Sequence, residues 1–341
     1  MIQSANTESD LTIKKTLEPT AEPTTFENVL RPKIFGEFVG QKNIKSNLMI
    51  AIKAATKRKD PLDHILLHGS PGLGKTTLAN IIANEFKVNI RITSGPALEK
   101  QGDIASIISN LEEHDVLFID EIHRLKPIVE EVLYTAMEDF GIDIIIGKGP
   151  SARTMRVDLP KFTLIGATTK VSMLSSPLRD RFGNVFKLQF YEDDDICDIV
   201  MRSAKILNCD IDNKAALLLA RCARNTPRIA NRLLKRVRDY AEVNDKNKID
   251  EIVLSEAMKA LGIDELGLDH IDRDYLGTII NKFRGGPVGL NTLSAATTED
   301  SATIEDIYEP FLIQLGFLER TSRGRIVTDR AYSHLGLTKY S

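Results

Sequence analysis

Residues 64–86 read HILLHGSPGLGKTTLANIIANEF, and this stretch decides the fold because it fills every position of the pattern G-x-x-x-x-G-K-[ST]. Gly69, Gly72 and Gly74 let the backbone take positive φ, so that successive N–H groups can point at one oxygen-rich ligand. Apolar residues before the loop predict a buried strand, and those after it recur at helical spacing. The sequence therefore predicts a phosphate-binding loop between a strand and a helix.

Two side chains of this loop predict the ligand. Lys75 should face the β- and γ-phosphates of a nucleotide, and the Thr76 hydroxyl should bind Mg²⁺. The helix that begins here directs the positive end of its dipole at the same phosphates. We therefore expect a nucleoside triphosphate and Mg²⁺ as cofactors, held by Gly72, Gly74, Lys75 and Thr76.

Length and composition set the broad class of the protein. A chain of 341 residues allows two to three domains, and its net charge of 45 − 48 = −3 means that any nucleic-acid contact must come from a local basic patch. Cys197, Cys209 and Cys222 form no C-x-x-C pair, which favours free thiols in a reducing compartment and not a metal site. Because neither an 18-residue apolar run nor a signal pattern is present, we expect a soluble, cytoplasmic protein with no membrane partner.

Strand patterns alternate with helical patterns through the first half of the chain. Besides the strand before the phosphate loop, apolar runs occur at 88–92, 116–120, 162–167 and 185–190. This alternation predicts an α/β fold with a doubly wound, five-stranded parallel sheet. Two β-patterned runs within 141–158, joined by KGPSAR, predict a β-hairpin inserted into that core.

The character of the sequence changes along the chain and predicts its domains. Residues 1–24 are rich in Thr, Glu, Ser and Pro without apolar periodicity, which is typical of a disordered tail. Residues 25–191 hold the sheet, and residues 192–263 show only helical periodicity, which predicts a small all-helical lid. Residues 264–341 place two short strands around a glycine after three helical patterns, the order of a winged-helix DNA-binding domain.

Polar residues at two strand ends predict the catalytic groups. Asp120 and Glu121 follow four apolar residues, so that Asp120 can order the Mg²⁺ shell while Glu121 polarises a water for attack on the γ-phosphate. Acids can end any buried strand, but next to a phosphate loop this pair forms a second nucleotide signature. Thr168 ends the fourth strand, and we expect it to sense the γ-phosphate; the alternative is an ordinary β-branched strand end.

Arginines predict further contacts with phosphate groups. Exposed arginines are usually only solvated, yet the guanidinium of Arg181 in SPLRDRF suits the γ-phosphate of a neighbouring subunit. Arg228, beside a proline at the start of a basic helix, should reach back to phosphate. In the wing, Glu319 is the only nearby acid in the sequence, and a basic cluster predicts contact with DNA through Arg320, Arg323 and Arg325.

Several motifs together resemble one family. GSPGLGKTT, VLFIDEIHRL, the hairpin with GKGPSAR, TLIGATT, SPLRDRFG, RNTPRIANR and FLERTSRGR are similar to those of the RuvB family of AAA+ ATPases, the bacterial Holliday junction branch migration ATPases. The resemblance runs from about Leu30 to Leu335. It implies a homo-hexameric ring around duplex DNA that drives junction migration by ATP hydrolysis, guided by RuvA and with RuvC as resolving partner. It also implies a role in recombination, DNA repair and the SOS response to DNA damage.

The resemblance also implies roles for residues of this chain. Arg181 matches the arginine finger, Arg228 the second sensor, and Arg320 and Arg325 the DNA contacts. Lys170 departs from the family pattern, in which arginine is usual. The nucleotide pocket would be lined by Leu30, Arg31, Gly72, Lys75, Thr76, Thr77, Glu138, Asp139, Phe140 and Tyr191.

Two alternatives to a DNA motor share these nucleotide motifs: an initiator-type AAA+ switch that binds DNA, and a ring that remodels proteins. The wing argues against a pure protein substrate. Ile144 and Ile146 are β-branched apolar residues in the predicted hairpin, which indicates that a partner covers them, and we expect this partner to be RuvA. Stimulation of ATP hydrolysis by junction or duplex DNA would distinguish a motor from a switch.

Overall fold

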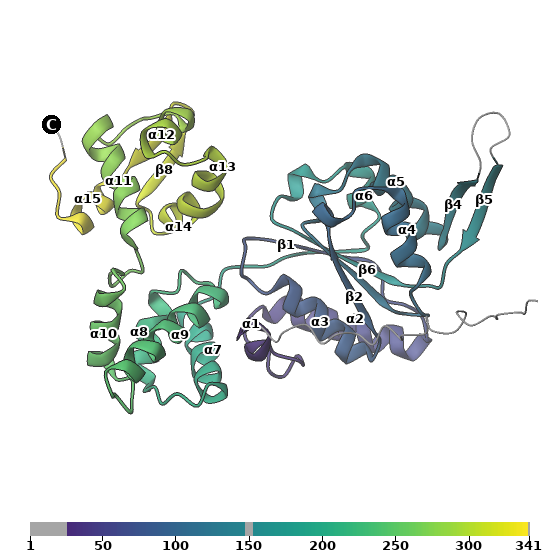
Figure 1. Cartoon of the computed structure of the whole chain (residues 1–341), viewed down its shortest axis with the longest axis horizontal. Coiled ribbons are helices and arrows are strands. Elements are labelled where there is room, and N and C mark those ends of the chain that lie inside the picture. The colour runs from purple at the N-terminus through teal and green to yellow at the C-terminus, as the bar shows by residue number, and fades with distance from the viewer. Residues whose placement is uncertain (1–25, 147–152, 340–341) are drawn as a thin grey trace, which may run out of the picture.

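The computed structural model describes residues 26–146 and 153–339, which form an α/β domain, a helical domain and a C-terminal domain (Figure 1). The predicted tail at 1–24 lies outside the described residues, so its disorder stays a prediction. Within the described ranges, no helix has the length and apolar character needed to cross a bilayer.

A five-stranded sheet forms the centre of the α/β domain. Its strands pair only in parallel, in the order β2-β3-β6-β1-β7. The carboxyl ends of β1, β3 and β6 therefore meet at one edge, where the phosphate loop follows β1. The strands are β1 (Ile65–His68), β2 (Ile90–Ser94), β3 (Val116–Asp120), β6 (Thr163–Thr168) and β7 (Asn184–Lys187), which confirms the predicted sheet.

Side chains alternate between two cores, one on each face of the sheet, because successive strand residues point to opposite sides. In β3, Val116 and Phe118 join one core, while Leu117 and Ile119 join the other. The first core contains residues of α2 (Lys42–Arg58) and α3 (Lys75–Phe86), and the second contains residues of α4 (Gln101–Ser109) and α5 (Pro127–Asp139). Helices on both faces make this a doubly wound sheet, as predicted.

Short elements complete the α/β domain around the sheet. The described part of the chain begins with a short helix that ends at Leu30, and the other short helices follow or precede strands. They are α1 (Phe26–Leu30), η1 (Gly95–Ala97), η2 (Ile122–Arg124), η4 (Val171–Met173) and α6 (Ser176–Asp180).

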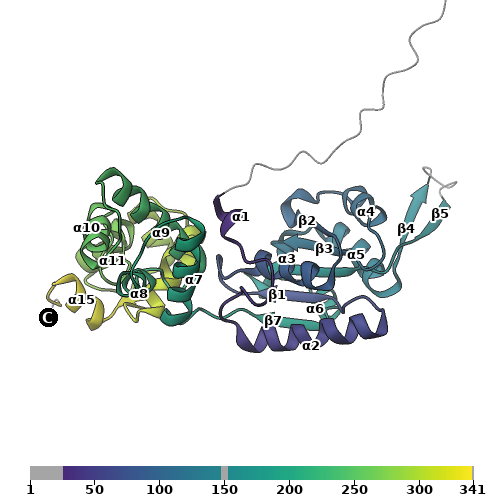
Figure 2. The ribbon, with the colours of Figure 1, turned by 90° about the horizontal axis from the view of Figure 1, so that it is seen from below.

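A β-hairpin leaves the α/β domain after α5 (Figures 1 and 2). Strands β4 (Gly141–Ile146) and β5 (Arg153–Asp158) pair in antiparallel register, with Ile142 opposite Val157 and Ile144 opposite Met155. Ile142 is buried in the second core, whereas Met155 is 48% exposed. The side chains of Ile144 and Ile146 lie outside the described residues, as does the connection at 147–152.

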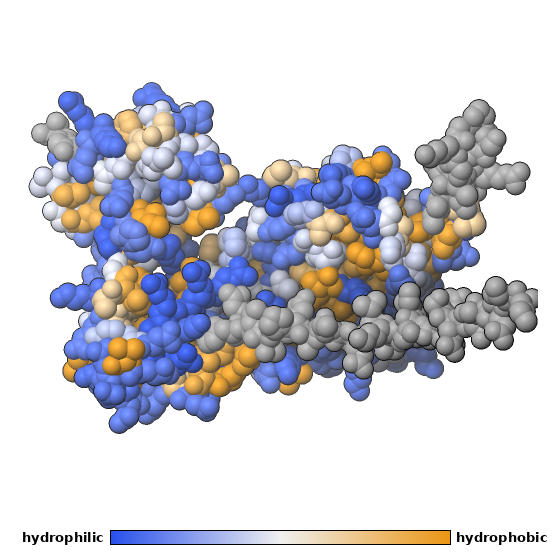
Figure 3. Space-filling model, in the orientation of Figure 1, coloured by the Kyte–Doolittle hydropathy of each residue, from blue (hydrophilic) through white to orange (hydrophobic). Residues whose placement is uncertain are grey.

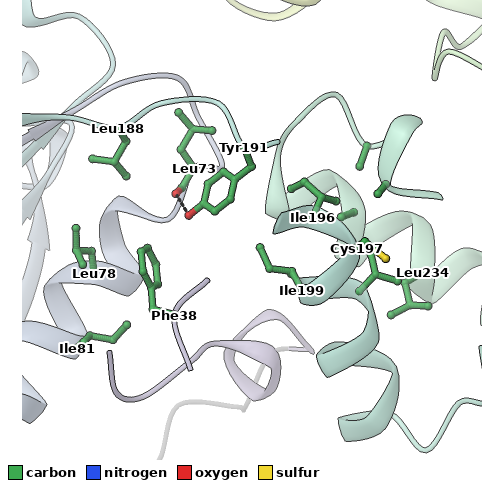
Figure 4. Close-up of a cluster of buried hydrophobic side chains, with 14 of the residues drawn as sticks. Phe38, Leu73, Leu78, Ile81, Leu188, Tyr191, Ile196, Cys197, Ile199 and Leu234 are labelled. Carbon is green, nitrogen blue, oxygen red and sulfur yellow. Dashed lines mark hydrogen bonds between the residues drawn. The ribbon is translucent and has the colours of Figure 1, made fainter. Parts of the chain in front are cut away.

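The helical domain shares a core with the α/β domain. It comprises α7 (Asp193–Ile206), α8 (Asn213–Arg221), α9 (Pro227–Val243) and α10 (Glu251–Ala260). Tyr191 lies between the two domains with Phe38 and Leu78 on one side and Ile196 and Ile199 on the other (Figure 4). Its hydroxyl donates a 3.2 Å hydrogen bond to the Leu73 carbonyl in the phosphate loop. The lid is therefore attached to the loop through buried apolar contacts.

The C-terminal domain has its own core and the element order of a winged helix. Helices precede a two-stranded antiparallel wing in which Arg320 lies opposite Arg325. The turn at 304–308 is a π-helix. The elements are α11 (His270–Phe283), α12 (Leu290–Thr297), α13 (Ser301–Thr303), η5 (Ile304–Tyr308), α14 (Glu309–Gln314), β8 (Leu318–Thr321), β9 (Gly324–Val327) and α15 (Asp329–Leu335).

A buried carboxylate links the wing to the helices of this domain. The Glu309 side chain is 0% exposed and accepts hydrogen bonds from Tyr275 Oη at 2.8 Å and Arg325 Nε at 2.8 Å. Arg320 also donates to this carboxylate. Two guanidinium groups therefore offset the cost of burying one negative charge.

Replacing Glu309 with Ala should destabilise the C-terminal domain by about 3 kcal/mol, because it leaves the partly buried Arg325 cation without this carboxylate. Hydrogen exchange of the amides at 265–336 in the full chain measures the change locally. Glu319→Ala on exposed β8 is the control and should have an effect below about 0.5 kcal/mol. Equal exchange rates in both variants would show that Glu309 does not hold the wing.

Candidate nucleotide-binding site

The phosphate loop has the backbone that the sequence predicts. Gly72 and Gly74 have φ values of 81° and 99°, and α3 begins directly afterwards at Lys75. A Cβ added at Gly72 would lie 2.7 Å from Thr226 Cγ2, in the helical domain. Glycine is therefore required here both for the backbone conformation and for the close approach of the lid.

A cavity lies between the α/β domain and the helical domain. It brings together residues that are far apart in the sequence, and most of them were predicted to bind nucleotide. The predicted residues that line it are Leu30, Arg31, Gly72, Gly74, Lys75, Thr76, Thr77, Asp120, Glu121, Tyr191 and Arg228. Its wall also contains Phe38, Ile199, Arg202, Pro227 and Asn231, which the sequence analysis did not identify as pocket residues.

Positive charge gathers at the phosphate loop. Lys75 is 7% exposed, and its ammonium donates to the carbonyls of Gly69 at 2.8 Å and Ser70 at 3.0 Å. Burial lowers the pKa of Lys75, and the nearby Arg228 cation lowers it further, whereas Glu121 and Asp120 act in the opposite direction. A bound polyanion would relieve the burial penalty and the repulsion between the two cations, so the cavity fits the phosphates of a nucleotide.

Oxygen ligands suited to Mg²⁺ lie on the same cavity wall. Thr76, the second residue of α3, offers a hydroxyl, and Asp120, the last residue of β3, offers a carboxylate. Within residues 26–146 and 153–339, no group of three or more His, Cys, Asp or Glu side chains could hold a metal by itself. This donor set fits a Mg²⁺ ion that takes its remaining ligands from phosphate and water.

Glu121 is held by two side-chain contacts at the sheet edge. Its Oε2 accepts a 3.2 Å hydrogen bond from Thr169 Oγ1 and lies 3.1 Å from His123 Nδ1. The same His123 nitrogen is 2.9 Å from Thr168 Oγ1. Glu121 itself has a φ of 46°, the left-handed region in which a residue with a side chain is strained. The carboxylate is therefore fixed at a defined place beside the phosphate loop.

Sequence reasoning did not identify His123 as part of this site. Burial lowers its pKa, while the Glu121 carboxylate acts in the opposite direction. The signal was its position two residues after Glu121, at the same carboxyl edge. Thr168, which we predicted as the γ-phosphate sensor, is fully buried and is bonded to His123, whereas Thr169 is the threonine bonded to Glu121.

Arg181 lies away from the cavity of its own chain. Its guanidinium donates to Glu138 Oε2 at 3.1 Å and to the Pro177 carbonyl at 2.7 Å, and it stacks 4.6 Å from the centre of the Tyr134 ring. Arg181 is not among the residues that line the cavity of its own chain. A finger that acts on a neighbouring subunit would occupy such a position.

The resemblance placed Glu138, Asp139 and Phe140 in the nucleotide pocket, but the structure puts them outside the lining of this cavity. Glu138 pairs with Arg181, and Asp139 pairs with Arg156 at 3.2 Å. Phe140 packs edge-on against Phe162 with ring centroids 6.0 Å apart. Glu138 and Asp139 end α5 and Phe140 follows it, so this segment begins beside Arg181.

Two of the wing arginines form ion pairs with carboxylates, although Glu319 is the only acid near them in the sequence. Arg325 is 13% exposed and pairs with Glu305 at 2.8 Å as well as with Glu309. Arg320 is 42% exposed and pairs with Glu309. Arg323 is exposed at the turn of the wing. Glu305 lies in η5 and Glu309 begins α14, which separates both from the wing strands, so only folding brings these acids to the arginines.

Comparison with known proteins decides the family. Residues 30–188 match the model of the P-loop domain of the Holliday junction DNA helicase RuvB. Residues 191–264 match the RuvB AAA lid domain, and residues 265–336 match the RuvB C-terminal winged helix domain. The chain belongs to the RuvB family.

Solved structures agree with this assignment. The chain is 50% identical to RuvB of Thermotoga maritima, described as a Holliday junction branch migration motor, with a TM-score of 0.83; the match covers 91% of this chain and 99% of that chain. A variant of the same Thermotoga protein is 51% identical with a TM-score of 0.83, over 90% of this chain and 98% of the other. The RuvB family consists of ATP-driven Holliday junction helicases, so this chain binds nucleotide, and the cavity contains its phosphate loop.

Replacing Glu121 with Gln should leave ATP affinity nearly unchanged and lower turnover by about 10²-fold or more, because an amide cannot accept the proton of the attacking water. Binding of a fluorescent ATP analogue and steady-state phosphate release measure the two effects. Glu113→Gln, exposed before β3 at the opposite end of the sheet, is the control. Hydrolysis near the parental rate in Glu121→Gln would exclude this residue as the catalytic carboxylate.

Proposed function

We propose that this chain is the ATP-driven motor of Holliday junction branch migration, which pumps duplex DNA through a homo-hexameric ring. The observation that carries the proposal is the position of Arg181. The cavity contains Lys75 and Arg228 of its own chain, but the predicted finger is bound to Glu138 outside it. A site that obtains its last cation from a neighbour hydrolyses ATP only within an assembly.

The residues of one subunit would divide the reaction among them. Lys75 and the loop N–H groups bind the phosphates, and Thr76 with Asp120 would hold Mg²⁺, which neutralises charge on the γ-phosphate. Glu121 would polarise the attacking water, and Thr168, which is buried and bonded to His123, would sense the γ-phosphate through that histidine. Arg228 closes the site from the helical domain, and Arg181 stabilises the transition state in the adjacent subunit.

The wing is proposed to contact DNA phosphates through Arg320, Arg323 and Arg325. A motor that passes any sequence gains nothing from reading base edges, and phosphate contacts carry no sequence information. Glu305 and Glu309 hold Arg320 and Arg325 on one face of the wing. DNA phosphates would therefore have to add to or replace these carboxylates.

The β-hairpin is proposed to bind RuvA through Ile144 and Ile146. Met155 lies opposite Ile144 in the register and is 48% exposed, which supports an apolar face directed away from the core. The family resemblance supports RuvC as a further partner, a cytoplasmic location, and a place in recombination, DNA repair and the SOS response.

The domain borders also remain a proposal, with an α/β domain at 25–191, a lid at 192–263 and a winged-helix domain at 264–341. The separate core of the C-terminal domain supports the last border. The border at 191 runs through a core that both neighbouring domains share, so these two domains should unfold together.

The trans role of Arg181 tests the proposed assembly. Arg181→Ala should keep ATP affinity but lower ATP hydrolysis by about 10³-fold or more, and abolish migration of a synthetic four-way junction in the presence of RuvA. Mixing Arg181→Ala with Lys75→Ala subunits should restore part of the hydrolysis, because an intact finger then faces an intact loop. Arg179→Ala, an exposed arginine two residues away, is the control. Absence of rescue in proven mixed rings would contradict a finger in trans.

A further inference from the structure

One ion pair joins the loop at 168–170 to the C-terminal domain. We call this segment the catalytic loop because Thr169 within it contacts Glu121. Lys170 follows β6 in the α/β domain, and its ammonium lies 2.7 Å from Asp306 Oδ2 in the π-helix η5. Figure 1 shows the α13 side of the C-terminal domain turned toward the α/β domain, and Figure 3 shows hydrophilic residues where the two approach. The contact is therefore polar, between parts that have separate cores.

The Lys170 end of this pair leads directly to the catalytic carboxylate. The Lys170 backbone N–H donates a 3.0 Å hydrogen bond to Thr168 Oγ1, which is 2.9 Å from His123 Nδ1. That nitrogen is 3.1 Å from Glu121 Oε2, and Thr169, next to Lys170, donates to the same oxygen at 3.2 Å. A displacement of Lys170 would therefore move two groups that touch Glu121.

The Asp306 end leads to the wing. Its neighbour Glu305 pairs with Arg325 at 2.8 Å, and Glu309 begins the helix that continues η5. A π-helical turn is rare and often occurs at functional sites, since it offsets the side chains on either side of it. Here the turn directs one carboxylate to the catalytic loop and another to the predicted DNA contacts.

We propose that Asp306 of the winged-helix domain is a positioning residue for ATP hydrolysis: through Lys170 it fixes the loop at 168–170, and with it Glu121, and it reports DNA contact at the wing to the catalytic centre of the same subunit. The second half rests on the proposed function, because it requires DNA at the wing. The first half requires only that Glu121 acts in hydrolysis.

A structural role would not have the same consequences. The side chains of Lys170 and Asp306 are 39% and 44% exposed, and half-exposed ion pairs contribute little to stability. Asp329 and Lys339 form a pair of the same 2.7 Å length on the C-terminal domain, but they touch neither the catalytic loop nor η5. That pair supplies a matched control.

The test compares kcat and KM for ATP with and without duplex DNA in full-length variants. Asp306→Asn and Lys170→Met should each lower kcat about two- to threefold without DNA, because Glu121 is held less well, and about five- to tenfold with DNA, because the wing no longer acts on the loop. The ratio of the two kcat values should therefore fall toward one, while KM and the melting temperature stay unchanged. Lys170→Arg keeps the cation and should behave as the wild type. The charge-swapped double variant, Lys170→Asp with Asp306→Lys, should recover at least half of the lost kcat.

Each other outcome overturns part of the account. Wild-type kcat in both single variants, an effect of equal size in Asp329→Asn, or no recovery in the charge swap would contradict a positioning role for Asp306. A wild-type chain that duplex DNA does not stimulate would contradict the proposed function instead. In that case kcat of the variants without DNA still decides whether Asp306 positions Glu121.

Discussion

Two cations from different domains meet at one phosphate loop, and the arrangement of the molecule depends on this constraint. Lys75 comes from the α/β domain, and Arg228 comes from the start of α9 in the lid. Burial disfavours the Lys75 ammonium and Arg228 adds repulsion, while Glu121 and Asp120 act in the opposite direction, so the phosphates of a nucleotide would further stabilise both cations. Tyr191 packs in the core that both domains share and bonds to Leu73 in the phosphate loop, so it holds the lid next to that loop.

The catalytic centre is connected to the rest of the assembly by polar contacts that can exchange partners. Arg181 pairs with Glu138 in the single chain, and in the proposed ring it would exchange this carboxylate for the phosphate of a neighbouring nucleotide. Arg320 and Arg325 pair with Glu309, and in the proposed DNA complex phosphates would add to or replace this carboxylate. In each case an arginine pairs with a carboxylate of its own chain. Such ion pairs suit a motor, because its contacts must form and break in every cycle.

Local patterns predicted the fold well, and long-range contacts explain what they missed. The five strands and the phosphate loop depend on apolar periodicity and glycine positions, which a sequence displays directly. The Glu309 network and the Lys170–Asp306 pair join residues that only folding brings together. His123 was missed although it lies two residues after Glu121, because its contact with both Glu121 and Thr168 forms only when β3 and β6 lie side by side. The pocket role of Glu138 came from resemblance and stays a prediction, because in the single chain Glu138 lies outside the cavity lining and pairs with Arg181.

The affinity of ATP for an Arg228→Ala variant tests the central claim, that nucleotide joins the two domains, most directly. A charge-assisted contact with phosphate contributes about 1.5–3 kcal/mol, so the Kd of a non-hydrolysable ATP analogue should rise by roughly 10- to 100-fold. Arg232→Ala removes an exposed cation from the same helix, one turn further from the cavity, and should leave Kd unchanged. Equal affinities in the two variants would contradict the claim that the lid arginine and Lys75 bind one nucleotide together.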